Sequence, residues 1–314
     1  MQEKRNKKLV ALLLTLIAIM VVLYVIKDEP DRIDIDREVF AYDDPSQIDR
    51  VSIDLGEEVV VELNFDGTRW LVNSQYKADP QRVKVLFAVL KQVRARRAAA
   101  RQQQDSLQSK MSTDGQTVTF FSSGKKIHEF EVIGNPDKGL TFMSQPQQDI
   151  YVAEIPGYRS YLAGIFEVDE QGWRDPLVFD INWRNIQSVH MIYPNQSESS
   201  FVVSFNDGDY KINQLQKTDT TKLFDLLDEV SRLYVNDYLR ESEVEGYALQ
   251  KDTTIATIAL VDVGGNYKTL EVLGKIDGEN THLVKKDSSD FGIISSEMLR
   301  TALRPRRFFQ MPKN

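Results

Sequence analysis

The sequence predicts an α+β fold: an N-terminal transmembrane helix, then two tandem repeated units of antiparallel strands with a packed amphipathic helix each. Three observations indicate this fold. A long apolar run lies near the N-terminus. Similar residues recur at a constant offset of 140 positions, as in Trp70 and Tyr210. Strand-like segments joined by tight turns surround single helix-like segments, which is typical of antiparallel α+β domains.

The apolar run covers residues 9–26 and contains 18 residues, of which Thr15 and Tyr24 carry the polar groups. As a helix rising roughly 1.5 Å per residue it would extend about 27 Å, close to the hydrocarbon thickness of a bilayer. Basic residues dominate the short segment 1–8, and acidic residues follow the run. This asymmetry predicts a single-pass anchor with a cytoplasmic N-terminus. A cleaved signal peptide is the alternative, but the residues at the end of the run are too bulky for a cleavage site.

The part of the chain beyond the predicted anchor is acidic. The whole chain has a net charge of −8 and residues 1–8 have +3, which leaves −11 for the remainder. We therefore expect no nucleic-acid partner. The chain has no cysteine, so disulfides, thiolate metal sites and cysteine nucleophiles are excluded. Residues 27–46 are rich in Asp, Glu and Pro and are predicted to form an acidic linker.

Residues 47–185 are predicted to form the first α+β repeat. Apolar or alternating segments predict strands at 51–55, 59–63, 70–72, 117–121 and 127–133. Asp79 is placed to cap a helix that has Pro80 in its first turn. Apolar residues three or four positions apart give this helix one apolar face: Val83, Leu86, Phe87, Leu90 and Val93. A short helix is expected near Tyr158–Leu162.

Residues 186–314 are predicted to form the second α+β repeat and a basic tail. Asp219 takes the capping position of Asp79. The apolar helix face is rebuilt at the same spacing by Leu223, Leu226, Leu227, Val230 and Leu233. Strands are expected at 255–261 and 267–273, and a short helix near Glu297–Leu303. The segment from Trp173 to Phe179 also resembles the segment from Leu303 to Phe309, so we expect the two tails to be equivalent.

The first repeat resembles the bacterial domain-of-unknown-function family 4340. The residues that carry the resemblance are Trp70-Leu71-Val72, Tyr76-Lys77-Ala78-Asp79, Val83, Leu86 and Leu90. It is best over residues 48–180, and Tyr210 and Thr218 replace the tryptophan and the alanine in the second repeat. The resemblance implies a single-pass envelope protein, because members of the family are often anchored in this way. It also implies an association with gliding-type ABC transporters, and it supplies no catalytic residues.

The search for catalytic, cofactor-binding or metal-ligating residues gives none. The histidines His128, His190 and His282 are far apart in the sequence, and no two have metal-ligand spacing. Nucleophile-elbow, phosphate-loop and dinucleotide-binding motifs are absent from the sequence. The acids Asp79 and Asp219 recur as predicted helix caps, and Asp137 and Asp277 recur in turn signatures. We therefore predict that the protein is not an enzyme and has no cofactor.

Two basic clusters stand out on this acidic protein. The first contains Arg94, Arg96, Arg97 and Arg101, and we expect it to continue the first helix beyond its apolar face. The second lies at the C-terminus and contains Arg300, Arg304, Arg306, Arg307 and Lys313. A solvated helix end and a charged tail explain both clusters. The first is also the possible partner-binding patch, for an acidic protein subunit, an anionic lipid or a polyanionic glycan.

Two functions from different classes follow. The first is a membrane-anchored extracytoplasmic binding or scaffold module, an auxiliary component of an ABC transport system whose partner is another envelope or transporter protein. Its location would be the bacterial inner membrane, with the C-terminal part periplasmic. The second is an envelope glycan hydrolase that uses paired carboxylates, which requires two acids about 5–10 Å apart in a cleft. The position of the deepest cleft and its acids distinguishes them.

Overall fold

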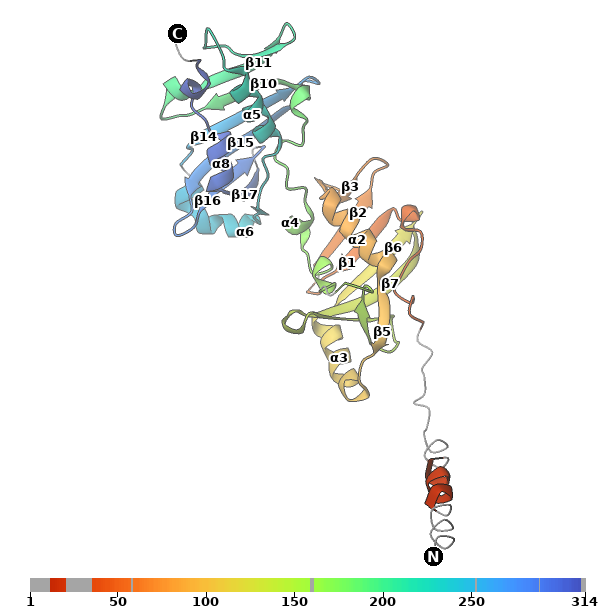
Figure 1. Ribbon diagram of the computed structural model, residues 1–314. Coiled ribbons are helices and arrows are strands. Elements are labelled where there is room, and N and C mark those ends of the chain that lie inside the picture. The colour runs from red at the N-terminus through yellow and green to blue at the C-terminus, as the bar shows by residue number, and fades with distance from the viewer. Residues whose placement is uncertain are drawn as a thin grey trace, which may run out of the picture.

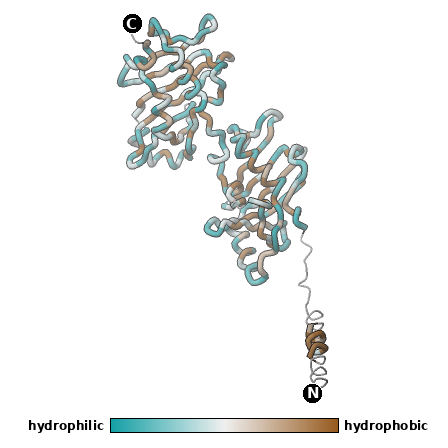
Figure 2. Tube along the Cα trace, viewed as in Figure 1, coloured by the Kyte–Doolittle hydropathy of each residue, from teal (hydrophilic) through white to brown (hydrophobic). Residues whose placement is uncertain are grey.

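The computed structural model describes residues 12–20, 36–57, 59–158, 161–251, 253–287 and 289–311. Residues 12–20 are helical, lie apart from the rest of the protein (Figure 1) and are strongly hydrophobic (Figure 2). Among the described residues, no helix combines the length and the apolar character that crossing a membrane requires. The predicted anchor is described only in part, since its residues 9–11 and 21–26 lie outside the described residues, as do residues 1–8.

The described residues of the first unit form a nine-stranded antiparallel sheet with the order β4-β3-β2-β1-β6-β7-β8-β9-β5. The strands are β1 (Arg50–Asp54), β2 (Val60–Phe65), β3 (Trp70–Val72), β4 (Tyr76–Lys77), β5 (Arg94–Ala98), β6 (Gln116–Ser122), β7 (Lys125–Asn135), β8 (Leu140–Ser144) and β9 (Tyr151–Glu154). Helix α2 (Pro80–Gln92) connects β4 at one edge with β5 at the other, so it crosses one face of the sheet (Figure 1). Helix α3 (Arg101–Asp114) then leads back to β6.

The described residues of the second unit form an eight-stranded antiparallel sheet with the order β12-β11-β10-β14-β15-β16-β17-β13. The strands are β10 (Ile186–Ile192), β11 (Phe201–Asn206), β12 (Asp209–Ile212), β13 (Asp237–Tyr238), β14 (Ala256–Asp262), β15 (Tyr267–Lys275), β16 (Thr281–Lys286) and β17 (Asp290–Ser295). The helices are α5 (Thr220–Ser231), α6 (Glu241–Val244), α7 (Ala248–Lys251) and α8 (Ser296–Ala302). The predicted α+β class with antiparallel sheets is therefore confirmed.

The two sheets have the same strand arrangement, apart from the additional strand β4. In each, three strands form one side, a helix crosses to an edge strand, and four strands then fill the remaining positions. The register also agrees, because Val118 lies opposite Phe130 in the first sheet and Ile258 lies opposite Leu270 in the second. These pairs are related by the predicted offset of 140 residues.

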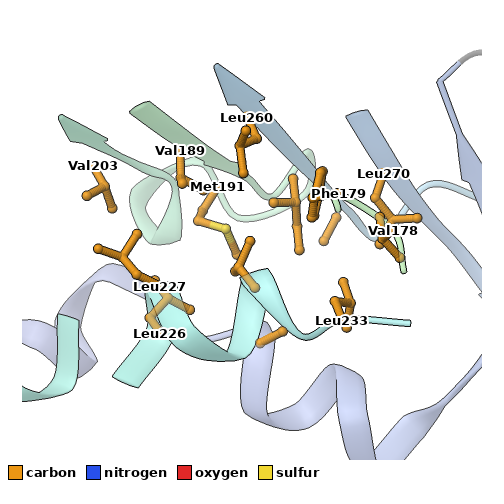
Figure 3. Close-up of a cluster of buried hydrophobic side chains, with 14 of the residues drawn as sticks. Val178, Phe179, Val189, Met191, Val203, Leu226, Leu227, Leu233, Leu260 and Leu270 are labelled. Carbon is orange, nitrogen blue, oxygen red and sulfur yellow. The ribbon is translucent and has the colours of Figure 1, made fainter. Parts of the chain in front are cut away.

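Each crossover helix starts at the predicted aspartate. The side chain of Asp79 accepts a hydrogen bond from the backbone of Gln81 at 2.8 Å, and that of Asp219 accepts one from the backbone of Lys222 at 3.2 Å. These bonds satisfy donors that have no partner inside the helix. The apolar face of α5 then packs on its sheet, and Figure 3 shows Leu226 and Leu227 near Val189 and Val203.

Alternation along the strands explains why each helix covers one face. In β1 the side chains of Val51 and Ile53 are buried, whereas those of Arg50 and Ser52 on the opposite face are partly exposed. A half-buried antiparallel strand has this pattern. Helix α3 covers part of the second face, where its Met111 packs in a small cluster with residues of β7, β8 and β9.

Two predicted helical segments of the first unit differ from the structure. Helix α2 ends at Gln92, and Arg94–Ala98 forms the edge strand β5 instead of a helical extension. The short helix expected near Tyr158–Leu162 is displaced, since Ile155 and Tyr158 are paired across a tight turn in which Gly157 has φ +82° and the 3-10 helix η3 covers Ala163–Ile165. Residues 159 and 160 lie outside the described residues. The equivalent helix of the second unit is confirmed as α8.

The predicted equivalence of the two tails has the wrong register. The carbonyl oxygen of Trp173 accepts a hydrogen bond from Asp79, and that of Phe309 accepts one from Asp219, both at 2.8 Å. Trp173 is therefore the counterpart of Phe309, not of Leu303. Both side chains are fully buried, and each closes the core beside its helix cap.

Packing places the unit limits differently from the predicted ones. Residues 36–48 pack on the first unit, where Phe40 is fully buried against Phe130 and Tyr151. The acidic linker can therefore not extend to residue 46, and its residues 27–35 lie outside the described residues. The two cores meet between Trp173 and Val178, earlier than the predicted limit at residue 185.

Candidate functional site

The predicted basic patch lies at an edge of the first sheet. Arg94, Arg96 and Arg97 belong to β5, and Arg101 begins α3. A bulge between Ala95 and Arg97 interrupts the pairing with β9, and Arg96 and Arg97 are both exposed as a result. A bulge and charged side chains are also the usual means by which an edge strand avoids pairing with another chain.

The four arginines differ in their ionic partners. Arg94 forms an ion pair with Glu38 at 3.3 Å, and Arg96 forms one with Glu154 at 3.4 Å. The guanidinium group of Arg97 donates to the carbonyl oxygen of Ala98 at 3.3 Å. The backbone N–H of Ala95 donates to Arg37 at 2.9 Å, which occupies part of the sheet edge. A partner would therefore contact this edge through the arginine side chains more than through the strand backbone. We call the four residues the basic edge.

The C-terminal basic cluster surrounds a separate hollow of about 700 Å³ on the second unit, lined by residues that include Arg306, Arg307 and Tyr193. The hydroxyl of Tyr193 donates to the carbonyl oxygen of Arg304 at 2.9 Å, and burial raises its pKa. Arg304 itself lies over the ring of Phe308. Lys313 lies outside the described residues. The cluster and the basic edge belong to different units, so they do not form one site.

Sequence reasoning missed a polar cluster that joins the two units, with Arg174 at its centre. Arg174 is 7% exposed, and its guanidinium group lies between the rings of Tyr76 and Tyr238, 3.7 and 3.9 Å from their centroids. Its Nη2 atom also lies 2.7 Å from Oδ2 of Asp290. Tyr76 belongs to the first unit, whereas Tyr238 and Asp290 belong to the second. A planar cation thus connects the units through two aromatic faces and one carboxylate.

Lysines and backbone hydrogen bonds reinforce this junction. Burial alone would lower the pKa of Lys77, but its hydrogen bonds to Asp175 and Asp180 outweigh this effect and raise the pKa. Burial lowers the pKa of Lys286, whose ammonium group donates to the carbonyl oxygen of Leu177 at 3.2 Å. The hydroxyl of Tyr238 donates to the carbonyl oxygen of Asp175 at 3.0 Å. The connecting segment is therefore bonded to both units.

Carboxylates do gather between the units, as the hydrolase hypothesis requires. A cleft of about 370 Å³ is lined by Asp79, Asp169, Asp237 and Glu243, among others. Asp79 caps α2, and Asp169 accepts from the backbone of Gly172 at 3.0 Å and pairs with Arg240. Glu243 accepts from the backbone of Arg240 at 2.7 Å. Three of these four acids thus have local structural roles, as a helix cap or as the partner of a backbone N–H or an arginine.

Two of the three histidines, His128 and His282, make local structural contacts. The Nε2 atom of His128 lies 3.0 Å from the carbonyl oxygen of Phe40, which can only accept, so Nε2 carries the hydrogen. Burial lowers the pKa of His128. His282 contacts the hydroxyl of Ser296, and burial lowers its pKa as well. In the part of the chain that the structure describes, no three His, Asp or Glu side chains are arranged to hold a metal ion.

Comparison with known families identifies one match. Residues 70–252 match the family described as a domain of unknown function, DUF4340. The match covers more than half of the chain and extends from the first unit through the junction into the second. Comparison with curated proteins found no match, and comparison with solved structures found none. The chain therefore belongs to the DUF4340 family.

Proposed function

We propose that this DUF4340 protein is a membrane-anchored, non-catalytic binding module that holds another envelope or transporter protein beside the bacterial inner membrane. The observation that carries the proposal is the basic edge, where two arginines are exposed at a strand bulge on an otherwise acidic chain. Exposed guanidinium groups recognise carboxylates in fixed, often bidentate geometry. The partner surface is therefore acidic.

The anchor places this basic edge close to the membrane. Arg37, which bonds to β5, follows the end of the predicted anchor at residue 26 by 11 positions. A fully extended segment of that length spans about 35–40 Å. A partner surface that rises only a few tens of ångströms above the bilayer is thus within reach. The single-pass topology, with residues 27–314 in the periplasm, is supported by the charge asymmetry around the apolar run.

The transporter association is supported by the family resemblance. In this proposal the protein is an auxiliary component of an ABC transport system, and it acts by positioning a partner. The contacts that Arg174 makes with both units suit this role, because two connected units orient a partner better than two units on a free tether. Chemistry on a substrate is not required of it.

The test is co-purification of a transporter subunit with the full chain from native membranes. Arg96→Glu with Arg97→Glu should reduce recovery of the subunit at least about tenfold, because both side chains are exposed and the reversal leaves two like charges against an acidic partner. The matched control is Lys125→Glu with Lys126→Glu, an equal charge reversal at an exposed hairpin of the same unit. Equal recovery with both double variants would remove the basic edge from the proposal. A cytoplasmic reporter enzyme that is active when fused after residue 314 would reverse the topology.

A further inference from the structure

The first unit has an apolar groove that the proposed function does not use. It has a volume of about 600 Å³ and lies between α2 and the segment that follows β9. Its floor includes Val85, Ala88 and Val89 of α2, and its wall includes Ile155, Leu162 and Val168. Val85 is 50% exposed and Tyr158 at the rim is 71% exposed. A valine that is half exposed beside other apolar side chains is the kind of surface that marks a binding groove.

The second unit provides an internal comparison, because the same helix positions there are charged. Offset by 140 residues, the groove positions Val85, Ala88, Val89 and Gln92 correspond to Asp225, Asp228, Glu229 and Arg232. Both helices start at an aspartate cap and bury equivalent apolar faces, so their outer faces are equivalent too. A solvated helix face in this fold is therefore compatible with charges. The apolar face of α2 is a property of the first unit alone.

The structure also shows why the groove is open. In the second unit, Ser295 caps α8 directly after β17, and α8 buries Leu299 and Ala302. The hydroxyl of Thr301 on α8 donates to Glu229 of α5 at 3.0 Å, so α8 lies beside the position that corresponds to Val89. In the first unit, Pro156 and Gly157 follow β9 and turn the chain instead of starting a helix. The shorter 3-10 helix η3 (Ala163–Ile165) packs on α2 there instead, and its Gly164 and Ile165 line the groove.

The charges around the groove select its occupant. Arg82 is the one charged residue among the described residues that line it. At its other end the groove reaches Gln92, the last residue of α2, and the guanidinium group of Arg94 lies at the same helix end, where it donates to the carbonyl oxygen of Lys91 at 3.2 Å. An apolar floor between basic ends complements a helix with an apolar stripe and acidic flanks.

We infer that the groove binds an amphipathic helix with acidic flanks, supplied by the partner protein, which lies along α2 beside η3. This inference rests on the proposed function, since it names the part of the partner that is bound. The apolar stripe of the helix contacts Val85, Ala88 and Val89. Its acidic flanks reach Arg82 at one end and the basic edge at the other.

The test uses the purified full chain in detergent micelles and two labelled helical peptides of about 15 residues. Both peptides carry leucines at positions i, i+3, i+4 and i+7, and the other positions are mainly glutamate in one peptide and lysine in the other. Fluorescence anisotropy should show binding of the glutamate peptide, at least about tenfold tighter than that of the lysine peptide at low salt. Val85→Asp should weaken this binding at least about tenfold. Gln81→Asp, an equal charge change at an exposed position outside the groove, should leave it unchanged.

The outcomes separate the inference from the function on which it rests. Val85→Asp is expected to fold, because Asp225 occupies this position in the second unit, and circular dichroism checks this. Failure of the glutamate peptide to bind, or binding that Val85→Asp does not weaken, overturns the inference. Self-association of the full chain that Val85→Asp abolishes also overturns it, since the occupant is then a second copy. The two experiments can also give different answers. If the glutamate peptide binds but the charge reversal at Arg96 and Arg97 leaves co-purification unchanged, the groove is upheld and the role of the basic edge is overturned.

Discussion

Arg174 holds the two units together, and its replacement by alanine tests this directly. The side chain leaves a space between Tyr76 and Tyr238, and Asp290 loses its guanidinium partner. The two sheets do not share strands, so the contacts of the connecting segment carry much of their coupling. We expect the variant to keep both folds and to lose part of the free energy that couples them.

The magnitude follows from three contributions. Removal of one partner of a buried ion pair costs about 3–5 kcal/mol. The side chain of Asp290 is 24% exposed, so water can replace part of the lost interaction, and we reduce this term to about 2 kcal/mol. Two cation–π contacts with partly buried rings add about 1 kcal/mol each. Arg174→Ala should therefore destabilise the junction by about 4 kcal/mol.

A double-mutant cycle measures the ionic part alone. Urea unfolding of the full chain, of Arg174→Ala, of Asp290→Ala and of the double variant should give a coupling energy of about 1–2 kcal/mol. Arg174→Lys keeps the charge but lacks the planar fork, so it should recover only part of the loss. Limited proteolysis should cut the segment near Pro176 faster in Arg174→Ala than in the wild type. A coupling energy below about 0.5 kcal/mol, together with unchanged proteolysis, would refute the assignment of Arg174 as the link between the units.

Two further predictions concern the first unit. Trp70→Ala should destabilise the protein by about 3 kcal/mol in thermal unfolding. This is the lower end of the range for truncation of a large aromatic side chain, because the ring packs on Phe65 and Phe87 but is only partly buried. An unchanged melting temperature would show that this packing contributes nothing. Burial lowers the pKa of His128 below its value of about 6.5 in the unfolded chain. At acidic pH the unfolded state therefore binds more protons than the folded state, so the free energy of unfolding should fall as the pH falls below about 6.5. His128→Gln, which can still donate to the carbonyl oxygen of Phe40, should flatten this pH dependence, and an unchanged slope would assign it to other groups.

Local patterns predicted much of the fold. Asp79 and Asp219 mark helix starts through their own side chains, and the apolar spacing after each residue identifies the face that packs. The offset of 140 residues also related Trp70 to Tyr210, which lie opposite Phe65 and Phe205 in equivalent strand pairs. These features depend on neighbouring residues in the sequence, so they can be recognised without the structure.

Features that depend on distant partners were not predicted. Arg94–Ala98 has the composition of a helix, because arginine and alanine are strong helix formers, yet it is a strand since β9 lies beside it to accept the pairing. Sheet pairing here overrides local propensity. Arg174 could not be recognised for the same reason, because its partners Tyr76, Tyr238 and Asp290 are about 60 to 120 residues away. The equivalence of Trp173 and Phe309 became evident from hydrogen bonds, not from sequence similarity.

The differences between the two units carry the functional argument. A duplicated fold needs the same buried faces in both copies, and α2 and α5 provide them. Selection for folding alone does not explain why the outer face of α2 has Val85 and Ala88 where α5 has Asp225 and Asp228. It also does not explain why the helix that accompanies α5 is replaced by a turn and the shorter 3-10 helix η3 beside α2. Both changes affect the groove beside α2, and both expose apolar surface there. The basic edge, which contains the predicted binding residues of this unit, follows α2 in the chain. The first unit is therefore where we expect a partner to bind.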